Sequence, residues 1–187
     1  MKKLPKRIFV AAGYNTIYMG TGRAEFNPSK PMRNFEDYLK ETASGTCSQL
    51  QNPEFDEGVL ANFMAGRFIK QGNLPGFLPF MVPSLQYKPC TRVEGACGSG
   101  GMAIATGIKS ILAGCSHSVF VTGFEIQNIV KAVYGADYLA GAAYFNGERK
   151  NGHAHFFPNI CSKRTGVYFA KYGAEKTRQA LAQWFVN

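Results

Sequence analysis

One cysteine near the middle of the chain has neighbours that favour thiol chemistry. Cys97 lies in Ala96-Cys-Gly-Ser-Gly-Gly-Met102, where a predicted strand turns into a predicted helix. A thiol reacts as the thiolate, and the N–H groups and dipole of a helix N-terminus favour negative charge. Gly98, Gly100 and Gly101 allow a substrate to approach the backbone, and the N–H groups there suit an oxyanion on a thioester carbonyl. We therefore predict that Cys97 is a nucleophile for thioester exchange.

Two other interpretations of this segment stay open. A cysteine in a glycine-rich turn can be a small, buried structural residue. The run Gly98 to Ala103 also matches the Gly-x-Gly-x-x-Ala dinucleotide fingerprint, and Glu125 ends the next predicted strand. The strand before the turn, however, carries Lys88, Arg92 and Glu94, whereas the first strand of a dinucleotide fold is normally apolar. The cysteine has no role in such a motif, so we favour the nucleophile.

The other residues that could do chemistry have simpler explanations. The remaining cysteines do not share the glycine-rich turn, and we expect structural roles for Cys47, Cys90, Cys115 and Cys161. His153 and His155 alternate as two metal ligands on one strand would, but no third ligand is in view, so we predict loop histidines and no metal site. Glu94 and Glu125 are expected to be structural hydrogen-bond acceptors, and Met102 is expected in the core.

The elements around Cys97 form a strand–helix–strand unit. Residues 96–114 have apolar side chains at helical spacing and end at Gly114, a natural residue for a helix C-terminus. This helix is expected to be mostly buried, and the strand after it fully buried. Segments 13–33 and 135–165 are expected to be loops, and 68–87 a mixed segment with a short helix. The expected strands are 6–12, 58–64, 88–95 and 118–122, and the other expected helices are 34–43 and 171–186. The order predicts an α/β fold.

The composition indicates a folded, basic protein. The chain has 187 residues, 45% of them hydrophobic, and a formal net charge of +9. No apolar run reaches the roughly 18–20 residues of a membrane helix, and the run behind the basic N-terminus is too short for a signal peptide. We therefore expect a cytoplasmic protein with reduced thiols. The charge would attract polyanions. Nucleic acid is one candidate partner and a phosphorylated cofactor such as coenzyme A is another. Because the basic residues are scattered and no nucleic-acid signature accompanies them, nucleic acid is disfavoured.

At this point the residues resemble a known family. The segments Val93 to Ala103, Ile111 to Gly114 and Val119 to Glu125 resemble the nucleophile region of thiolases: a cysteine and Ser-Gly at the start of a buried helix, then a strand that ends in Gly-x-Glu. Gly135 to Leu139 and Tyr168 to Gly173 resemble the loop region of sterol-carrier-protein-2-type thiolases. The resemblance implies a thiolase-like N-terminal domain with a mixed sheet over residues 1–134 and part of a loop region over 135–187.

The same resemblance implies an acetyl-CoA acetyltransferase or 3-ketoacyl-CoA thiolase activity. Cys97 would be acylated by acyl-CoA in a ping-pong mechanism, with coenzyme A thioesters as substrates and no covalently bound cofactor. The backbone N–H of Cys97 would contribute to an oxyanion hole. Because the family binds coenzyme A partly through its loop region, Arg149, Lys163 and Arg164 are candidates to bind its phosphates. The alternative, which we favour for these side chains, is a solvated surface. The family implies a homo-oligomer or a complementary C-terminal half as partner.

The chain also departs from the family pattern. Family members are about twice as long, and their second half supplies a Gly-His-Pro histidine, an asparagine and a second cysteine. Gly152-His153-Ala154 does not match Gly-His-Pro, so the base that activates Cys97 is not identified. We expect that the last strand of the domain and the C-terminal half are missing. A synthase-type condensing enzyme of the same fold and a non-catalytic fragment or partner subunit remain alternatives.

Overall fold

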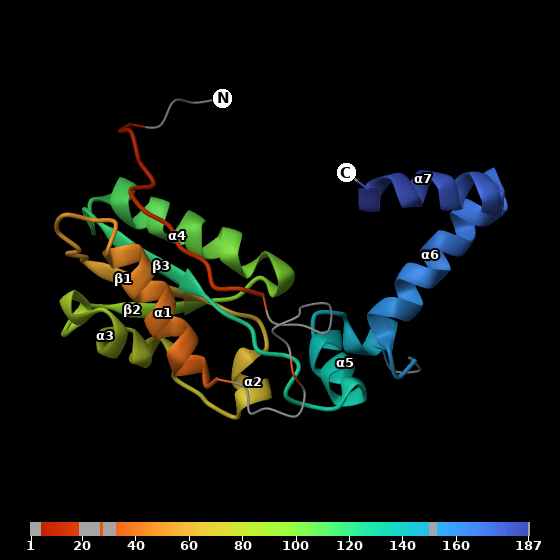
Figure 1. Ribbon diagram of the computed structural model, residues 1–187, viewed down its shortest axis with the longest axis horizontal. Helices are drawn as coiled ribbons and strands as arrows, with labels where there is room; N and C mark the ends of the chain where they lie inside the picture. The colour runs from red at the N-terminus through yellow and green to blue at the C-terminus, as the bar shows by residue number, and fades with distance from the viewer. Residues whose placement is uncertain (1–4, 19–26, 28–32, 150–152, 187) are drawn as a thin grey trace. The chain divides into compact units, whose positions relative to one another are not determined.

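The computed structural model of the chain describes residues 5–18, 27, 33–149 and 153–186 (Figure 1). The chain divides into two compact units, Met1–Val130 and Lys131–Asn187, which are described separately. The boundary expected between residues 134 and 135 falls within the first helix of the second unit, α5 (Ala132–Ala140).

The first unit is built on a parallel sheet. Its strands are β1 (Glu57–Ala61), β2 (Cys90–Val93) and β3 (Val119–Gly123), in the order β2-β1-β3. Both outer strands run parallel to β1. The α/β class and these three strands agree with the sequence expectation. The sheet of the described residues is parallel throughout, however, and not mixed.

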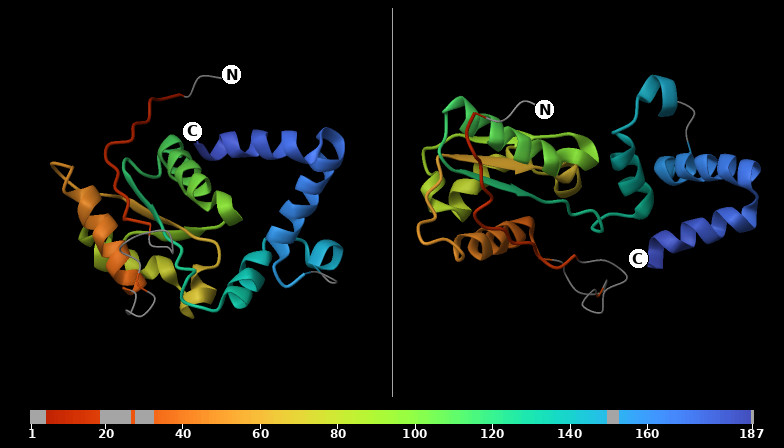
Figure 2. Two further views of the ribbon diagram at one scale, coloured as in Figure 1. Left: turned by 45° about the vertical axis from the view of Figure 1, so that its right-hand side comes forward. Right: turned by 90° about the horizontal axis from the view of Figure 1, so that it is seen from above.

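Helices cover the two faces of the sheet. They are α1 (Phe35–Cys47), α2 (Ala65–Ile69), α3 (Leu78–Met81) and α4 (Ser99–Ala113), with short 3-10 turns at Leu74–Phe77, Pro83–Leu85 and Ala96–Gly98. Residues of α1 and α3 share the larger hydrophobic core with Leu60 and Phe120, whereas Ala103 of α4 packs with Val59 and Ala61. Figure 2 shows α4 and α1 on opposite faces of the sheet.

Helix α1 forms as the sequence predicted. Asn34 is the N-cap, and its backbone N–H donates to the carboxylate of Asp37 at 3.2 Å. Phe35, Leu39 and Ala43, spaced four apart, are all buried on the face that meets the sheet.

The predicted first strand, residues 6–12, is wrong. Residues 7–18 form no strand, and the side chains of Phe9 and Val10 are 76% and 92% exposed. Both edges of β1 are already paired, with β2 and β3. The segment is instead attached to α1. The Tyr14 hydroxyl donates to Glu41 at 3.1 Å, and the side-chain amide of Gln49 donates to the Gly13 carbonyl at 2.9 Å.

Helix α4 is less buried than predicted. Its buried residues are Ser99, Ala103 and Gly107, whereas Met102 and Ile104 are 47% and 54% exposed. The expected core position of Met102 is therefore wrong, because within this chain only one face of α4 meets the sheet. Strand β3 is also less buried than predicted. Phe120 faces the larger core and is buried, while Val121 on the other side is 36% exposed.

The second unit is helical where loops were expected. Helix α5 is followed by a π-helical turn at Phe145–Arg149, by α6 (Phe156–Tyr172) and by α7 (Ala174–Val186). The prediction of a loop over 135–165 is therefore wrong for most of that range, whereas the helical prediction for 171–186 agrees with α7. No helix among the described residues has the length and apolarity needed to cross a bilayer.

Candidate nucleophile site

Cys97 lies in the turn that joins β2 to α4. It occupies the 3-10 turn Ala96–Gly98, and α4 begins at Ser99. The side chain of Cys97 is exposed. The sequence placed this cysteine where a strand turns into a helix, and in the structure it stands two residues before the first residue of the α-helix, at the carboxyl end of a parallel strand.

Hydrogen bonds fix the backbone on both sides of Cys97. The buried hydroxyl of Ser99 accepts the backbone N–H of Gly95 at 3.0 Å and donates to the carbonyl of Ala96 at 2.6 Å. The carboxylate of Glu94 accepts the backbone N–H of Ala96. Ala96 has φ of +49°, a left-handed conformation that costs a non-glycine residue about 1–3 kcal/mol. Ser99 and Glu94 therefore hold a strained turn in one conformation.

The N–H groups of the turn differ in availability. The N–H of Gly98 donates to the Gly95 carbonyl at 2.9 Å, and the N–H of Ser99 donates to Ala96. The N–H of Cys97 donates no hydrogen bond within the described residues. Of these groups, the N–H of Cys97 is therefore the donor left for an oxyanion.

The predicted glycines border open space. A Cβ added at Gly98, Gly100 or Gly101 would meet no heavy atom within 4 Å. Packing within the described chain therefore does not require glycine at these three positions. The arrangement keeps the approach to the Cys97 backbone free of side chains.

Glu94 and Glu125 have the hydrogen-bonding role expected from the sequence. Besides the bond from Glu94 to the turn, the carboxylate of Glu125 accepts the backbone N–H groups of Phe63 and of Met64, the latter at 2.9 Å. Glu125 thereby connects the segment after β3 to the segment after β1. Both carboxylates hold the carboxyl ends of the strands in place.

The cationic residues proposed for substrate binding all lie in the second unit. Arg149 forms an ion pair with Asp137 at 2.8 Å. Its guanidinium also lies over the ring of Phe145, 5.6 Å from the centroid. Lys163 and Arg164 are exposed on α6. Arg149 therefore contributes to the structure of its own unit, while Lys163 and Arg164 face solvent.

The other thiols and the histidines show how Cys97 differs. Burial raises the pKa of Cys47 and of Cys90, whereas Cys115 and Cys161 are exposed as Cys97 is. Exposure alone does not single out Cys97, but the fixed, glycine-lined turn does.

The two alternating histidines contact each other. The backbone N–H of His155 donates to Nδ1 of His153 at 3.0 Å. Within the described residues, no group of three or more potential ligands is arranged to hold a metal ion.

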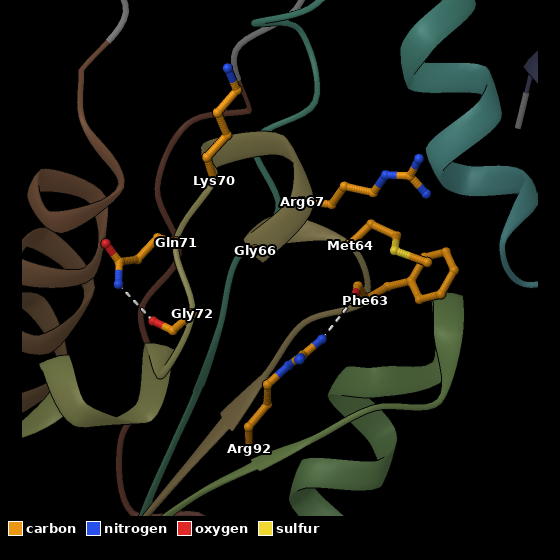
Figure 3. Close-up of a pocket in the computed structure, with 8 residues that line it drawn as sticks. All are labelled: Phe63, Met64, Gly66, Arg67, Lys70, Gln71, Gly72 and Arg92. Atoms are coloured by element: carbon orange, nitrogen blue, oxygen red, sulfur yellow. Dashed lines mark hydrogen bonds between the residues drawn. The ribbon is translucent and has the colours of Figure 1, made fainter.

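Sequence reasoning missed a basic hollow at the end of the sheet. It has a volume of about 350 Å³ and is lined by residues after β1, by residues of α2 and the segment that follows, and by Arg92 of β2 (Figure 3). Asn62, between β1 and this lining, is 2% exposed, and neither polar atom of its side chain has a hydrogen-bond partner. Seven of the eight lining residues lie in the segment 63–72, but only the pairing of β2 with β1 brings Arg92 beside them, so no local motif indicated the hollow.

The known proteins that this chain matches include two archaeal relatives. The acetyl-CoA acetyltransferase of Methanothermobacter thermautotrophicus is 28% identical over 150 residues, which cover 79% of this chain and 37% of the relative. The acetyl-CoA acetyltransferase of Methanocaldococcus jannaschii is 26% identical over 137 residues, 73% of this chain and 33% of the relative. The chain thus matches about a third of the length of these curated relatives. No family model matches the chain.

Proposed function

Because this chain is a relative of the acetyl-CoA acetyltransferases of the thiolase family, we propose that it provides the nucleophile for an acyl transfer from acyl-CoA. The observation that carries the proposal is the state of Cys97. Its thiol is exposed in a fixed turn, and its own N–H has no hydrogen-bond partner among the described residues. No side chain of the described residues crowds Gly98, Gly100 or Gly101.

In the first step, the Cys97 thiolate attacks the carbonyl carbon of the acyl-CoA thioester. The carbonyl oxygen becomes an oxyanion, which the N–H of Cys97 is suited to stabilise. The bond between the carbonyl carbon and the coenzyme A sulfur then breaks. Coenzyme A leaves as the thiol with the proton that Cys97 released, and the acyl group remains on the Cys97 sulfur.

In the second step, the acyl group leaves Cys97 for a second nucleophile. That nucleophile is the thiol of coenzyme A in thiolysis or the carbanion of a second acetyl-CoA in condensation, which gives the ping-pong order. A base must move the proton in each step. The sequence has no Gly-His-Pro motif, so we propose that a complementary C-terminal half supplies the base.

Substrate binding and assembly complete the proposal. Exposed Lys163 and Arg164 are suited to the phosphates of coenzyme A. Arg149, already paired with Asp137, is suited to position this region. We further propose that the chain works in an oligomer of its own copies or together with the complementary half.

Intact-mass spectrometry after incubation with acetyl-CoA tests the proposal. We expect one acetyl adduct on the wild-type chain and none on Cys97→Ala. Cys115→Ala is the matched control, because Cys115 is also exposed but follows α4 instead of preceding it. If folded wild type stays unmodified, even when the complementary half is added, the chain is a non-catalytic fragment or subunit.

A further inference from the structure

The hollow beyond the carboxyl end of β1 has the features of an anion site, and we propose that it binds a phosphate group of a small soluble molecule. Three basic side chains line it, those of Arg67, Lys70 and Arg92. No aspartate or glutamate is among the lining residues. One carboxylate, that of Glu125, accepts the backbone N–H groups of the lining residues Phe63 and Met64. The lining cations outnumber it, which favours an anionic ligand.

The sheet and a hydrogen bond hold Arg92 in place. It pairs in register with Leu60 on β1, and one of its terminal nitrogens donates to the Phe63 carbonyl at 2.8 Å (Figure 3). This bond uses one of the five N–H donors of a guanidinium. The remaining N–H donors of the guanidinium lie near the hollow. A phosphate can accept two parallel hydrogen bonds from such a guanidinium.

Lys70 has a backbone that the end of α2 fixes. It adopts a left-handed conformation, with φ of +57°, and its N–H donates to the Gly66 carbonyl. The N–H of Gln71 donates to the same carbonyl at 3.0 Å. These two bonds end α2 sharply and set the direction in which the chain continues along the hollow. The Lys70 side chain is exposed and available to a ligand.

The position of the hollow agrees with ligand binding. In open α/β sheets, ligands bind beyond the carboxyl ends of the strands. The hollow lies there, between the segment after β1 and Arg92 near the end of β2. Cys97 follows β2 at the same end of the sheet, but no residue of its turn lines the hollow. The inference is thus independent of the proposed acylation.

The size and charge of the hollow favour phosphate over a larger polyanion. About 350 Å³ accommodates a small molecule. A phosphomonoester carries about −1.5 to −2 charges and three acceptor oxygens at neutral pH, which matches a set of several cationic donors. Inorganic phosphate and the phosphates of coenzyme A share this chemistry.

Calorimetric titration with inorganic phosphate at constant ionic strength tests the inference. The variants are Lys70→Gln and Arg92→Gln, with Lys109→Gln as control, because Lys109 is exposed on α4 and does not line the hollow. We expect each hollow variant to weaken phosphate binding about tenfold, as for the loss of one charge-assisted contact. Lys109→Gln and Cys97→Ala should bind as wild type does. Lys70→Gln keeps the test valid if Arg92→Gln disturbs the fold.

Two further titrations identify the source of the phosphate. If coenzyme A binding weakens in Lys70→Gln while binding of phosphate-free pantetheine does not change, the phosphate belongs to coenzyme A. If only inorganic phosphate is affected, the ligand is a different phosphate compound. The proposal is overturned if folded wild type does not bind phosphate, or if Lys109→Gln weakens binding as much as the hollow variants do.

Discussion

The side-chain oxygen of Ser99 lies 3.0 Å from the backbone nitrogen of Gly95, and this hydrogen bond closes the turn that contains Cys97. The same hydroxyl donates to Ala96, the strained residue directly before Cys97. A buried serine at the start of α4 therefore fixes the conformation in which the nucleophile is presented.

Ser99→Ala should destabilise the protein and loosen the turn. The substitution leaves the Gly95 N–H and one acceptor site of Ala96 without their partner. Because Gly95 is exposed and Ala96 half-buried, water can replace part of the lost bonding, and the expected cost is about 0.5–1.5 kcal/mol. Urea unfolding measures this loss. Thr106→Ala is the control, because Thr106 makes a similar bond to Met102 at 2.8 Å on the exposed side of the same helix. Equal losses in the two variants would contradict a special role for Ser99.

Glycine substitutions should separate folding from chemistry. Gly98→Ala introduces a methyl group into open space, so its unfolding free energy should stay within about 1 kcal/mol of wild type. At Gly123 a Cβ would lie 2.8 Å from the backbone oxygen of Ala61, and Gly123→Ala should cost about 1–3 kcal/mol.

The Gly98→Ala variant also tests how the substrate approaches Cys97. Because the added methyl group would stand beside the nucleophile, Gly98→Ala should form the acetyl adduct more slowly while remaining folded. Denaturation and adduct formation are measured on the same preparations. A Gly98→Ala protein that is as stable and as reactive as wild type would show that the substrate does not approach the backbone there.

Asp56 should give the protein a component of acid sensitivity. The backbone N–H groups of His117 and Ser118 donate to its carboxylate, the former at 2.8 Å, and hold its pKa below the ordinary value. A folded pKa below the unfolded one stabilises the protein above the unfolded pKa of about 3.9, and this contribution is lost as the pH falls through the folded pKa.

Comparison with Asp56→Asn isolates this contribution. The difference in unfolding free energy between wild type and the variant should be constant above about pH 5 and should shrink at lower pH. Glu54→Gln, at an exposed carboxylate two residues away, should retain the wild-type pH profile. A wild-type-minus-variant difference that does not change with pH would refute the role of the Asp56 carboxylate.

The thiols should react with a maleimide in two groups. Cys97, Cys115 and Cys161 are exposed and should be labelled quickly, whereas burial covers Cys47 and Cys90 and raises their pKa. Peptide mapping over a time course assigns each rate. If Cys97 reacted as slowly as Cys90, the turn would be closed in solution, and the proposed nucleophile would be inaccessible.

The features that depend on local sequence were predictable. Asn34 and the four-residue spacing of Phe35, Leu39 and Ala43 define α1 without reference to the rest of the chain. The strand, the glycine-rich turn and the helix around Cys97 could likewise be predicted from the sequence, because turn and helix signals are local.

Features that depend on distant partners were not predictable. An apolar run such as Ile8–Ala12 indicates a strand, but it cannot show that β3 pairs directly with β1. The apolarity of α4 indicates a helix that favours burial, yet only other parts of the structure decide whether Met102 and Ile104 are covered. The Gly95 N–H donates to the Ser99 hydroxyl across a turn in which Ala96 has a left-handed φ, and nothing in the sequence required that conformation.

Localisation of the acyl group by tandem mass spectrometry tests the central claim most directly. The wild-type chain, with all five of its cysteines, is incubated with acetyl-CoA, alone and together with the complementary half, and every cysteine peptide is analysed in one experiment. We predict a thioester-linked acetyl group on Cys97 and on no other cysteine. Equal acetylation of Cys115 and Cys161 would show unspecific transfer to exposed thiols, and an unmodified Cys97 would contradict its role as the nucleophile.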